Sequence, residues 1–194
     1  MFAPNLIARA EELVARYRTA GLMAATAESC TGGLISGLLT EIPGSSHMLE
    51  RGFVVYSNAA KQELLGVPAE TLANHGAVSE ETAVAMAEGA LRGSRAEVAV
   101  SVTGIAGPDG GTAAKPVGLV HFACALRGRP TVAREERFGA IGREEVRLAS
   151  VRVALGRGTT TAVTASPKSA CGTPITALSS TPSIESISLS TSFG

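Results

Sequence analysis

The chain has 194 residues, a length that suits one domain with a sizeable hydrophobic core. Its 17 Lys and Arg residues balance 17 Asp and Glu residues, so no overall field gathers nucleic acid or an anionic membrane, and neither is expected as a partner. The three cysteines lack zinc-ligand spacing, and no signal peptide or membrane-spanning apolar run is visible, which favours a cytoplasmic protein without a metal centre or a disulfide framework.

Hydrophobic periodicity predicts strands that alternate with helices. In chain order we expect helix 6–20, strand 22–27, helix 34–42, strand 52–56, helix 57–65, helix 79–92, strand 98–102, strands 117–126 and 131–138, and helix 144–155. Ser57 and Ser79 are suited to cap the helices that follow them. The segment Arg127–Pro130 joins two strands by a tight connection, so these two should be antiparallel. The pattern predicts an α/β fold, a three-layer sandwich in which helices flank a mixed sheet of about five strands.

The composition changes sharply at residue 159. Of the last 36 residues, 17 are Ser or Thr, and only Lys168 and Glu185 are charged. Such a segment buries too little apolar surface to offset chain entropy, so we expect domain 1–158 to be followed by a disordered tail, 159–194. The last helix also ends abruptly at Gly156. A shifted reading frame at the end of the gene would produce this pattern, and an authentic linker would have the same composition.

Three loops should meet where the strands end, because ligands of open α/β sheets collect at the carboxyl ends of strands. They are 28–33, 56–61 and 103–112. Ser29 lies at a strand end just before a helix whose first residues include Gly32 and Gly33. An exposed hydroxyl there, beside free amides, fits a nucleophile with oxyanion donors. Spacing alone favours the simpler role, in which Ser29 or Thr31 caps the helix.

A serine nucleophile needs a base. The three histidines occur in no arrangement that identifies a Ser/His/Asp triad, and each fits a surface or turn position. Lys61 lies one helical turn beyond Tyr56 and in reach of the same sheet edge. It would serve as a base only if desolvation lowered its pKa, and a solvated surface lysine is the alternative.

Other groups near these loops allow rival chemistry. Cys30 is intrinsically more reactive than serine and lies near a helix N-terminus, or else it is buried packing. The loop that begins at Thr103 is rich in glycine and could cradle a phosphate, although it lacks the order of a P-loop. Asp109 and Glu28 could bind magnesium, but two carboxylates are thin evidence for a metal.

Four segments together resemble the C-terminal domain of the CinA (competence/damage-inducible) family. They read as follows: Ala27-Glu28-Ser29-Cys30-Thr31-Gly32-Gly33; Arg51-Gly52-Phe53-Val54-Val55-Tyr56-Ser57-Asn58 with Lys61; His75-Gly76-Ala77-Val78-Ser79; and Val102-Thr103-Gly104-Ile105-Ala106-Gly107-Pro108-Asp109-Gly110-Gly111-Thr112 with Lys115-Pro116-Val117-Gly118. The resemblance covers roughly residues 5–155. Before the last helix this chain has Ile141-Gly142-Arg143 where the family commonly has Gly-Asp-Arg.

The resemblance implies a function. Stand-alone members of that family are nicotinamide mononucleotide amidohydrolases, which form nicotinic acid mononucleotide and ammonia in bacterial pyridine nucleotide salvage and use no cofactor. The family's serine and lysine fall on Ser29 and Lys61, with Tyr56 nearby, so these three are the expected catalytic residues. The expected substrate-binding residues are Thr31, Gly32, Gly33, Asn58, Thr103, Gly104, Gly107 and Arg143. Arg143 could pair with the substrate phosphate, and a surface residue at the start of the last helix is the alternative.

Two other classes of protein fit parts of the pattern. A non-catalytic nucleotide-binding module would use the same glycine loops without breaking a bond, and it would need no lysine beside Ser29. A metal-dependent phosphohydrolase would lose activity in EDTA. We also expect a homo-oligomer, a dimer or a tetramer, since small domains with shallow strand-end sites often complete them across a symmetric interface.

Overall fold

A mixed sheet forms the centre of the molecule, which the computed structural model describes over residues 2–165. Its strands are β1 (Ala24–Glu28), β2 (Leu49–Val54), β3 (Val98–Gly104), β4 (Leu119–Leu126) and β5 (Val132–Arg137). They lie in the order β2-β1-β3-β4-β5. Strand β1 pairs in parallel with β2 and β3, whereas β4 pairs in antiparallel fashion with β3 and β5. The tight connection predicted after β4 is therefore confirmed.

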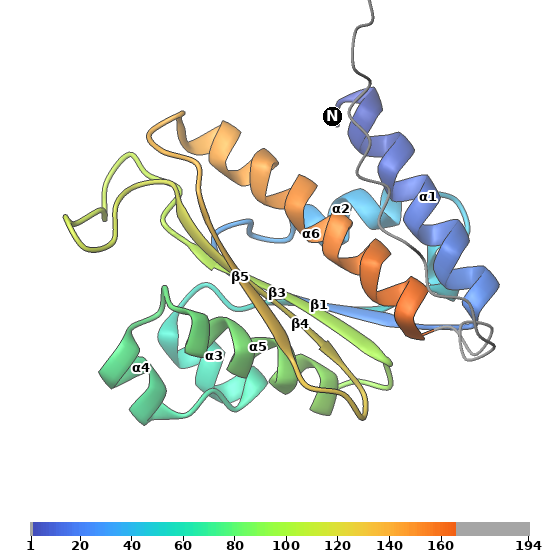
Figure 1. Ribbon diagram of the computed structural model, residues 1–194, viewed down its shortest axis with the longest axis horizontal. Helices are drawn as coiled ribbons and strands as arrows, with labels where there is room; N and C mark the ends of the chain where they lie inside the picture. The colour runs from blue at the N-terminus through green and yellow to red at the C-terminus, as the bar shows by residue number, and fades with distance from the viewer. Residues whose placement is uncertain (1, 166–194) are drawn as a thin grey trace, which may run out of the picture.

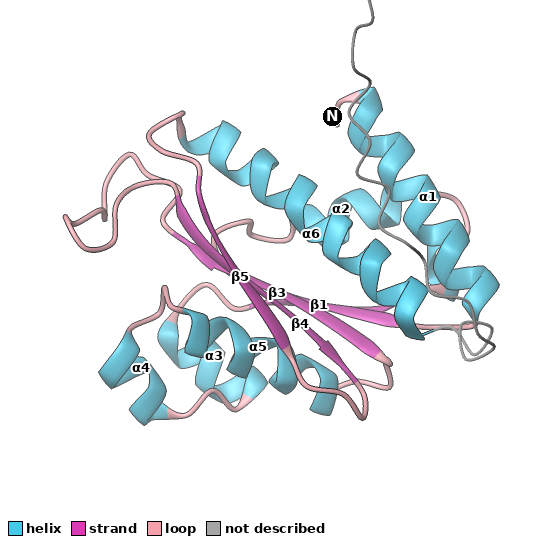
Figure 2. Cartoon of the chain, viewed as in Figure 1, coloured by secondary structure: helices cyan, strands magenta, loops and turns pink. Residues whose placement is uncertain are grey.

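Helices cover both faces of this sheet. Within the described range they are α1 (Pro4–Ala20), α2 (Leu34–Glu41), α3 (Asn58–Leu65), α4 (Ala69–His75), α5 (Glu80–Arg92) and α6 (Arg143–Ala165), with a short 3-10 helix at Ser45–His47. Figure 1 shows α1, α2 and α6 on one side of the sheet and α3, α4 and α5 on the other. The same three layers are visible in Figure 2, where strands separate two groups of helices. The predicted three-layer α/β sandwich is confirmed.

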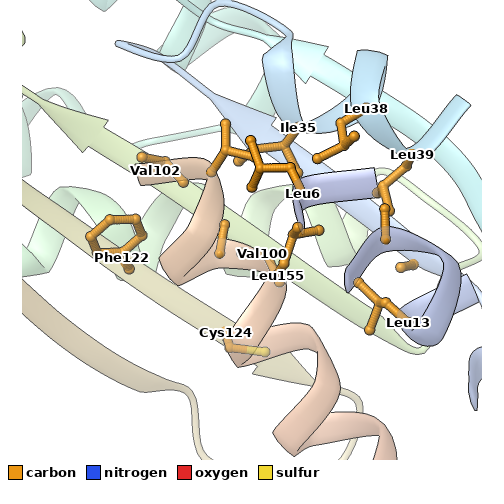
Figure 3. Packing of buried hydrophobic residues seen from close by; sticks show 14 of the residues in the cluster. Leu6, Leu13, Ile35, Leu38, Leu39, Val100, Val102, Phe122, Cys124 and Leu155 are labelled. Atoms are coloured by element: carbon orange, nitrogen blue, oxygen red, sulfur yellow. The ribbon is translucent and has the colours of Figure 1, made fainter. Parts of the chain in front are cut away.

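Each face of the sheet has its own core because side chains alternate along a strand. On β3, the side chains of Val98, Val100 and Val102 pack against α1, α2 and α6. Figure 3 shows Val100 and Val102 in this cluster. The intervening Ala99 belongs to a second cluster, which includes Leu65 of α3 and Met86 of α5. Both faces are buried, so the central strand is apolar almost throughout.

The second strand differs from its prediction. We expected 52–56, but β2 spans Leu49–Val54, which includes Glu50 and Arg51. Strand β2 pairs only with β1 and lies at the edge of the sheet. An edge strand tolerates polar side chains, and Arg51 forms an ion pair with Glu50. The apolar run that guided the prediction therefore covered only part of the strand.

Helix α4 was not predicted. It follows Pro68, has seven residues and buries only Leu72, so its apolar pattern is too short to be recognised in the sequence.

The predicted end of the last helix at Leu155 is wrong, because α6 continues to Ala165. Gly158 lies against α1: a Cβ there would be 3.3 Å from a Leu13 methyl. The hydroxyl of Tyr17 also donates to the carbonyl of Gly158 (3.2 Å). Contact with α1 thus supports the helix at two glycines where its own propensity is low.

The predicted disordered tail begins at residue 159, but residues 159–165 belong to α6. Residues 166–194 lie outside the described residues, so disorder there stays a prediction. None of the helices in residues 2–165 has both the length and the hydropathy that crossing a bilayer requires.

Candidate active site

The ends of β1, β2 and β3 surround a cavity of about 250 Å³. Because β1 runs parallel to both neighbours, the three strands end at the same edge of the sheet, as expected. The cavity is lined by Ser29, Cys30, Tyr56, Lys61, Ala77, Val78, Thr103, Gly104, Ile105, Ala106, Gly107, Asp109, Gly110 and Arg143. Six of the predicted site residues beyond Ser29 are therefore in this wall: Tyr56, Lys61, Thr103, Gly104, Gly107 and Arg143.

Ser29 and Lys61 are in direct contact in this cavity. Ser57 caps α3 by accepting a hydrogen bond from the Ala60 amide, as predicted, and this places Lys61 one turn into the helix. The Lys61 Nζ lies 3.1 Å from Ser29 Oγ. The serine is held in turn by its amide, which donates to the Val102 carbonyl of β3 (2.9 Å). The structure thus joins a hydroxyl and an amine that are far apart in the sequence.

Burial changes the acidity of Lys61. Its side chain is only 1% exposed, and the Nζ also donates to the carbonyls of Val55 (2.9 Å) and Tyr56 (3.3 Å). Desolvation lowers the pKa of Lys61 below its ordinary value of 10.5, and the nearby Cys30 thiol opposes this shift to a smaller extent. A lysine in this setting gives up its proton more readily than a solvated lysine, so it can act as a base for Ser29.

Cys30 is less suited to be the nucleophile. It lines the same cavity, but its side chain belongs to the core beneath α2 and α6. Burial raises the pKa of the Cys30 thiol to about 12. The reactive form of cysteine is the thiolate, so at neutral pH this sulfur stays protonated and weakly nucleophilic.

The amides of Gly32 and Gly33, which the sequence suggested as oxyanion donors, have acceptors within the protein. The amide of Gly32 donates to the Ser29 carbonyl (3.1 Å), and that of Gly33 donates to a Glu28 carboxylate oxygen (3.0 Å). Both amides are therefore occupied within the protein. The two glycines line a different cavity, of about 640 Å³, which lies along α2 and the start of α6.

Neither Ser29 nor Thr31 caps helix α2. The N-cap is Gly33, and the carboxylate of Glu28 accepts the amides of the first turn instead. Thr31 is fully buried and does not line the Ser29 cavity. Asn58 is exposed at the start of α3 and is also outside the cavity wall. Thr31 and Asn58, like Gly32 and Gly33, therefore lie outside the wall of the Ser29 cavity, which contains Thr103, Gly104, Gly107 and Arg143.

Arg143 links two walls of the cavity. As the first residue of α6, it donates from Nη1 to the Gly107 carbonyl (2.9 Å) and from Nη2 to the Tyr56 hydroxyl (3.4 Å). Tyr56 itself is 63% exposed. The phenol and the guanidinium therefore stand at the solvent side of the cavity, where a ligand would meet them first.

The glycine-rich loop forms the opposite wall. Thr103 directs its hydroxyl to the Ala77 carbonyl (2.7 Å). Gly104 permits close approach to β4, because a Cβ there would lie 2.7 Å from a Val120 methyl. Gly107 has a positive φ of 79°, which favours glycine. These residues shape the wall through the backbone.

The segment Ala77–Val78 is part of the cavity wall to which the sequence assigned no role. It is fixed by Lys115, whose Nζ donates to the carbonyls of His75 (2.5 Å) and Val78 (2.7 Å). The segments His75–Ser79 and Lys115–Gly118 were both among those that carried the family resemblance. The sequence therefore pointed to each segment separately, but only the tertiary structure shows that they contact each other.

The described residues offer little to a metal. Glu28 is fully buried and engaged with α2, whereas Asp109 is exposed at the rim of the cavity. Within residues 2–165, no three His, Cys, Asp or Glu side chains gather as a metal site would require. The magnesium site considered from the sequence is therefore not assembled from Glu28 and Asp109.

The histidines lie away from the Ser29 cavity. His47 and His75 are exposed, as expected. The expectation that His121 is a surface or turn residue is wrong, because it is 7% exposed on β4, where burial lowers its pKa. None of the three lines the cavity.

Known proteins share this architecture. The sequence model of the CinA C-terminal domain matches residues 7–160. The nicotinamide-nucleotide amidohydrolase PncC of Escherichia coli K12 is 49% identical over 151 residues, which cover 78% of this chain and 91% of that protein. The solved structure of the competence/damage inducible protein CihA from Agrobacterium tumefaciens has a TM-score of 0.81 and 54% identity, over 82% of this chain and 97% of that chain.

A longer relative shares only this domain. A CinA-like protein from Syntrophobacter fumaroxidans is 54% identical over 140 residues, which are 72% of this chain. The match covers 32% of the relative, so the chain spans about a third of its length.

Proposed function

The chain belongs to the CinA C-terminal domain family, and from this premise we propose that it hydrolyses the carboxamide of nicotinamide mononucleotide to nicotinic acid mononucleotide and ammonia. The relative PncC, which is named for this activity, is covered almost completely by the match. The observation that carries the proposal is the 3.1 Å contact between Lys61 Nζ and Ser29 Oγ inside a cavity. A protein that only binds a nucleotide needs no such buried pair.

The proposed mechanism follows from that pair. Neutral Lys61 accepts the Ser29 proton as the serine oxygen attacks the carboxamide carbon. The tetrahedral intermediate collapses, the C–N bond breaks, and Lys61 returns the proton to the departing ammonia. Water then attacks the acyl-enzyme ester while Lys61 again takes a proton. The carboxylate product leaves, and Ser29 recovers its hydrogen.

Other amides must support the oxyanion if Gly32 and Gly33 do not. We propose those of Ala106 and Gly107, which line the cavity and for which the structure gives no acceptor in residues 2–165. Each well-placed donor typically contributes about 3 kcal/mol to transition-state stabilisation. The glycine-rich loop would then stabilise charge at the reacting carbon.

Arg143 and Tyr56 are proposed to hold the rest of the substrate. A guanidinium at the solvent side of the cavity is suited to a phosphate, which accepts two parallel hydrogen bonds. The Tyr56 ring lies beside it and is exposed enough to cover a ribose or a pyridine ring. In this arrangement the carboxamide enters first and the phosphate stays near the surface.

The test is ammonia release from nicotinamide mononucleotide by purified protein. Ser29→Ala should lower kcat by about 10³-fold or more, since it removes the attacking atom. Cys30→Ala serves as the matched control in the next residue and should retain activity. A nucleotide-binding module would bind the substrate and release no ammonia, and loss of activity in Cys30→Ala alone would overturn the assignment of Ser29.

We also propose a homo-oligomer, a dimer or a tetramer, located in the cytoplasm. Val54 and Leu64 are each more than half exposed although they are large and apolar, which is typical of a surface that another subunit covers. The proposed substrate is a charged nucleotide, which a bilayer retains inside the cell. Sedimentation analysis of the purified protein should give a mass of two or four chains, and a monomer would contradict the first proposal.

A further inference from the structure

The turn that carries Ser29 lies between two side chains of opposite charge. We propose that Glu28 and Arg147 are positioning residues, which hold residues 29–33 from two sides and thereby set Ser29 Oγ against Lys61. The proposal rests on the function proposed above, because it assigns a purpose to the geometry of the same serine. Neither residue touches the reacting atoms.

Glu28 holds the helix side of the turn. Its side chain is fully buried, and Oε2 accepts the amides of Gly33 (3.0 Å) and Ile35 (3.1 Å). Oε1 accepts both the amide (2.9 Å) and the hydroxyl (2.8 Å) of Ser36. A negative charge is favoured at these amides by the helix dipole. The residue before the nucleophile is therefore fixed to the first turn of α2.

Arg147 holds the turn from α6. Its Nη2 donates to the Thr31 carbonyl (2.8 Å) and would lie only 3.5 Å from a Cβ at Gly32. The Nε is buried, and the structure gives it no hydrogen-bond partner among residues 2–165. The hydrogen bond to Thr31 therefore joins α6 to the turn that carries Ser29.

The two charges reach the same small region. Behind the larger effect of burial, the pKa of the Cys30 thiol is raised by the Glu28 charge and lowered by that of Arg147. Cys30 is the second residue of the turn and follows the nucleophile directly. Glu28 accepts hydrogen bonds from backbone amides, and Arg147 donates one to a backbone carbonyl. The backbone of the turn is therefore held both through its N–H groups and through a C=O group.

The position of the turn matters because the proposed reaction depends on the distance between Ser29 Oγ and Lys61 Nζ. Proton transfer from Ser29 to Lys61 needs the two atoms within hydrogen-bond reach, and they are 3.1 Å apart. A displacement of about 1 Å costs roughly 100-fold in rate. Loosening either side of the turn should therefore lower kcat more than it raises KM.

The experiment compares Arg147→Met with Arg147→Lys and with Arg152→Met, a control on the same helix. For each folded protein, kcat and KM are measured with nicotinamide mononucleotide. Ser29 is also labelled with phenylmethylsulfonyl fluoride, a step that forms an S–O bond, breaks the S–F bond, releases fluoride and passes the serine proton to Lys61. Arg147→Met should lower both kcat and the labelling rate by about 10- to 100-fold, with KM changed less than about threefold.

The controls separate positioning from folding. Arg147→Lys keeps a donor for the Thr31 carbonyl and should restore part of the lost rate, while Arg152→Met should match the wild type. Wild-type kcat and labelling in Arg147→Met would overturn the role of Arg147 and leave the proposed function intact. If wild type releases no ammonia but its labelling still depends on Arg147, the proposed function fails and the positioning role stands.

Glu28 is tested through its partner on α2, because Glu28→Gln risks the fold. Ser36→Ala removes one hydroxyl donor to the carboxylate and leaves the helix amides in place. It should lower the rate of Ser29 labelling by several-fold while the protein stays folded, and Glu28→Gln should lower it further if it folds. Labelling at the wild-type rate in Ser36→Ala would overturn the role of Glu28.

Discussion

Lys61 is buried, and its hydrogen-bond partners within residues 2–165 include no carboxylate. Its amine contacts one hydroxyl and two carbonyls, all neutral oxygens. Neutral partners offset the cost of desolvating an ammonium only in part, which is why burial is the dominant cause of its lowered pKa. Burial destabilises the charged form of Lys61, and it thereby favours the neutral amine that can act as a base.

The pH dependence of the reaction should report this lysine. As the base, Lys61 must be neutral, so kcat/KM rises as the pH increases through its pKa. Because desolvation lowers that pKa, the rising limb should lie below the ordinary value of 10.5. A steady-state profile with Lys61→Arg as the comparison checks this. A flat profile, or a retained limb in Lys61→Arg, would show that another group is the base.

The sequence supported Ser29 and Lys61 only in part. The periodicity placed both at strand ends, but eight residues of α3 are too few to show which face is buried, and the pattern alone favoured a solvated surface lysine at position 61. It also favoured capping by Ser29 or Thr31, whereas Glu28 satisfies the amides of α2. A carboxylate that folds back onto its own helix is a tertiary arrangement, and no spacing rule indicated it.

At the scale of elements, helix α5 packs closely on α3 because Gly89 has no side chain. A Cβ at Gly89 would lie 2.1 Å from the Leu65 carbonyl. Gly89→Ala should therefore destabilise the fold by about 1–3 kcal/mol or more, as overpacking does. Gly37 of α2 has no atom within 4 Å of such a Cβ, so Gly37→Ala should stabilise by about 0.5–1 kcal/mol. Urea unfolding of the two variants should shift the midpoint in opposite directions.

The end of α6 gives a second prediction at this scale. Tyr17→Phe removes the hydrogen bond to the Gly158 carbonyl and should lower the free energy of unfolding by about 0.5–1.5 kcal/mol. Tyr56→Phe is the matched control, because its hydroxyl takes part only in a long, solvent-exposed contact with Arg143 among the described residues and should contribute little to stability. Thermal denaturation of both variants measures the difference. Equal stability would mean that the helix does not continue past Gly156 against α1.

The elements that the sequence predicted well are those with long apolar patterns. Helix α1, helix α5 and the strands that follow α5 lie within a few residues of their predicted bounds. The errors fall on β2, α4 and the end of α6. An edge strand, a helix of seven residues and a helix held at glycines by its neighbour all depend on tertiary contact more than on local pattern.

For the whole molecule, the proposed chemistry needs no metal ion. Serine attack with a lysine base moves protons only between Ser29, Lys61, water and ammonia. Activity should therefore be unchanged after dialysis against EDTA, measured as ammonia release before and after. Inactivation by EDTA with recovery on addition of magnesium would instead favour the phosphohydrolase considered from the sequence.

The α/β sandwich brings three distant segments to one sheet edge, and the site depends on that topology. Strand order follows from which strands pair, and the sequence alone predicted the strand ends but not that β1 would lie between β2 and β3. This central place of β1 puts the serine turn between the α3 lysine and the glycine-rich loop. The family resemblance identified the expected catalytic residues, whereas the strand order of the sheet brings them close together.

The proposed mechanism requires a covalent intermediate at Ser29. To detect it, nicotinamide mononucleotide is mixed with the protein, the reaction is quenched in acid within milliseconds, and the masses of the peptides are measured by mass spectrometry. The Ser29 peptide should gain the mass of the substrate acyl group, this gain should disappear in Ser29→Ala, and ammonia should be released together with its formation. Ammonia release with no adduct on any peptide, or an adduct on Cys30, would contradict the mechanism.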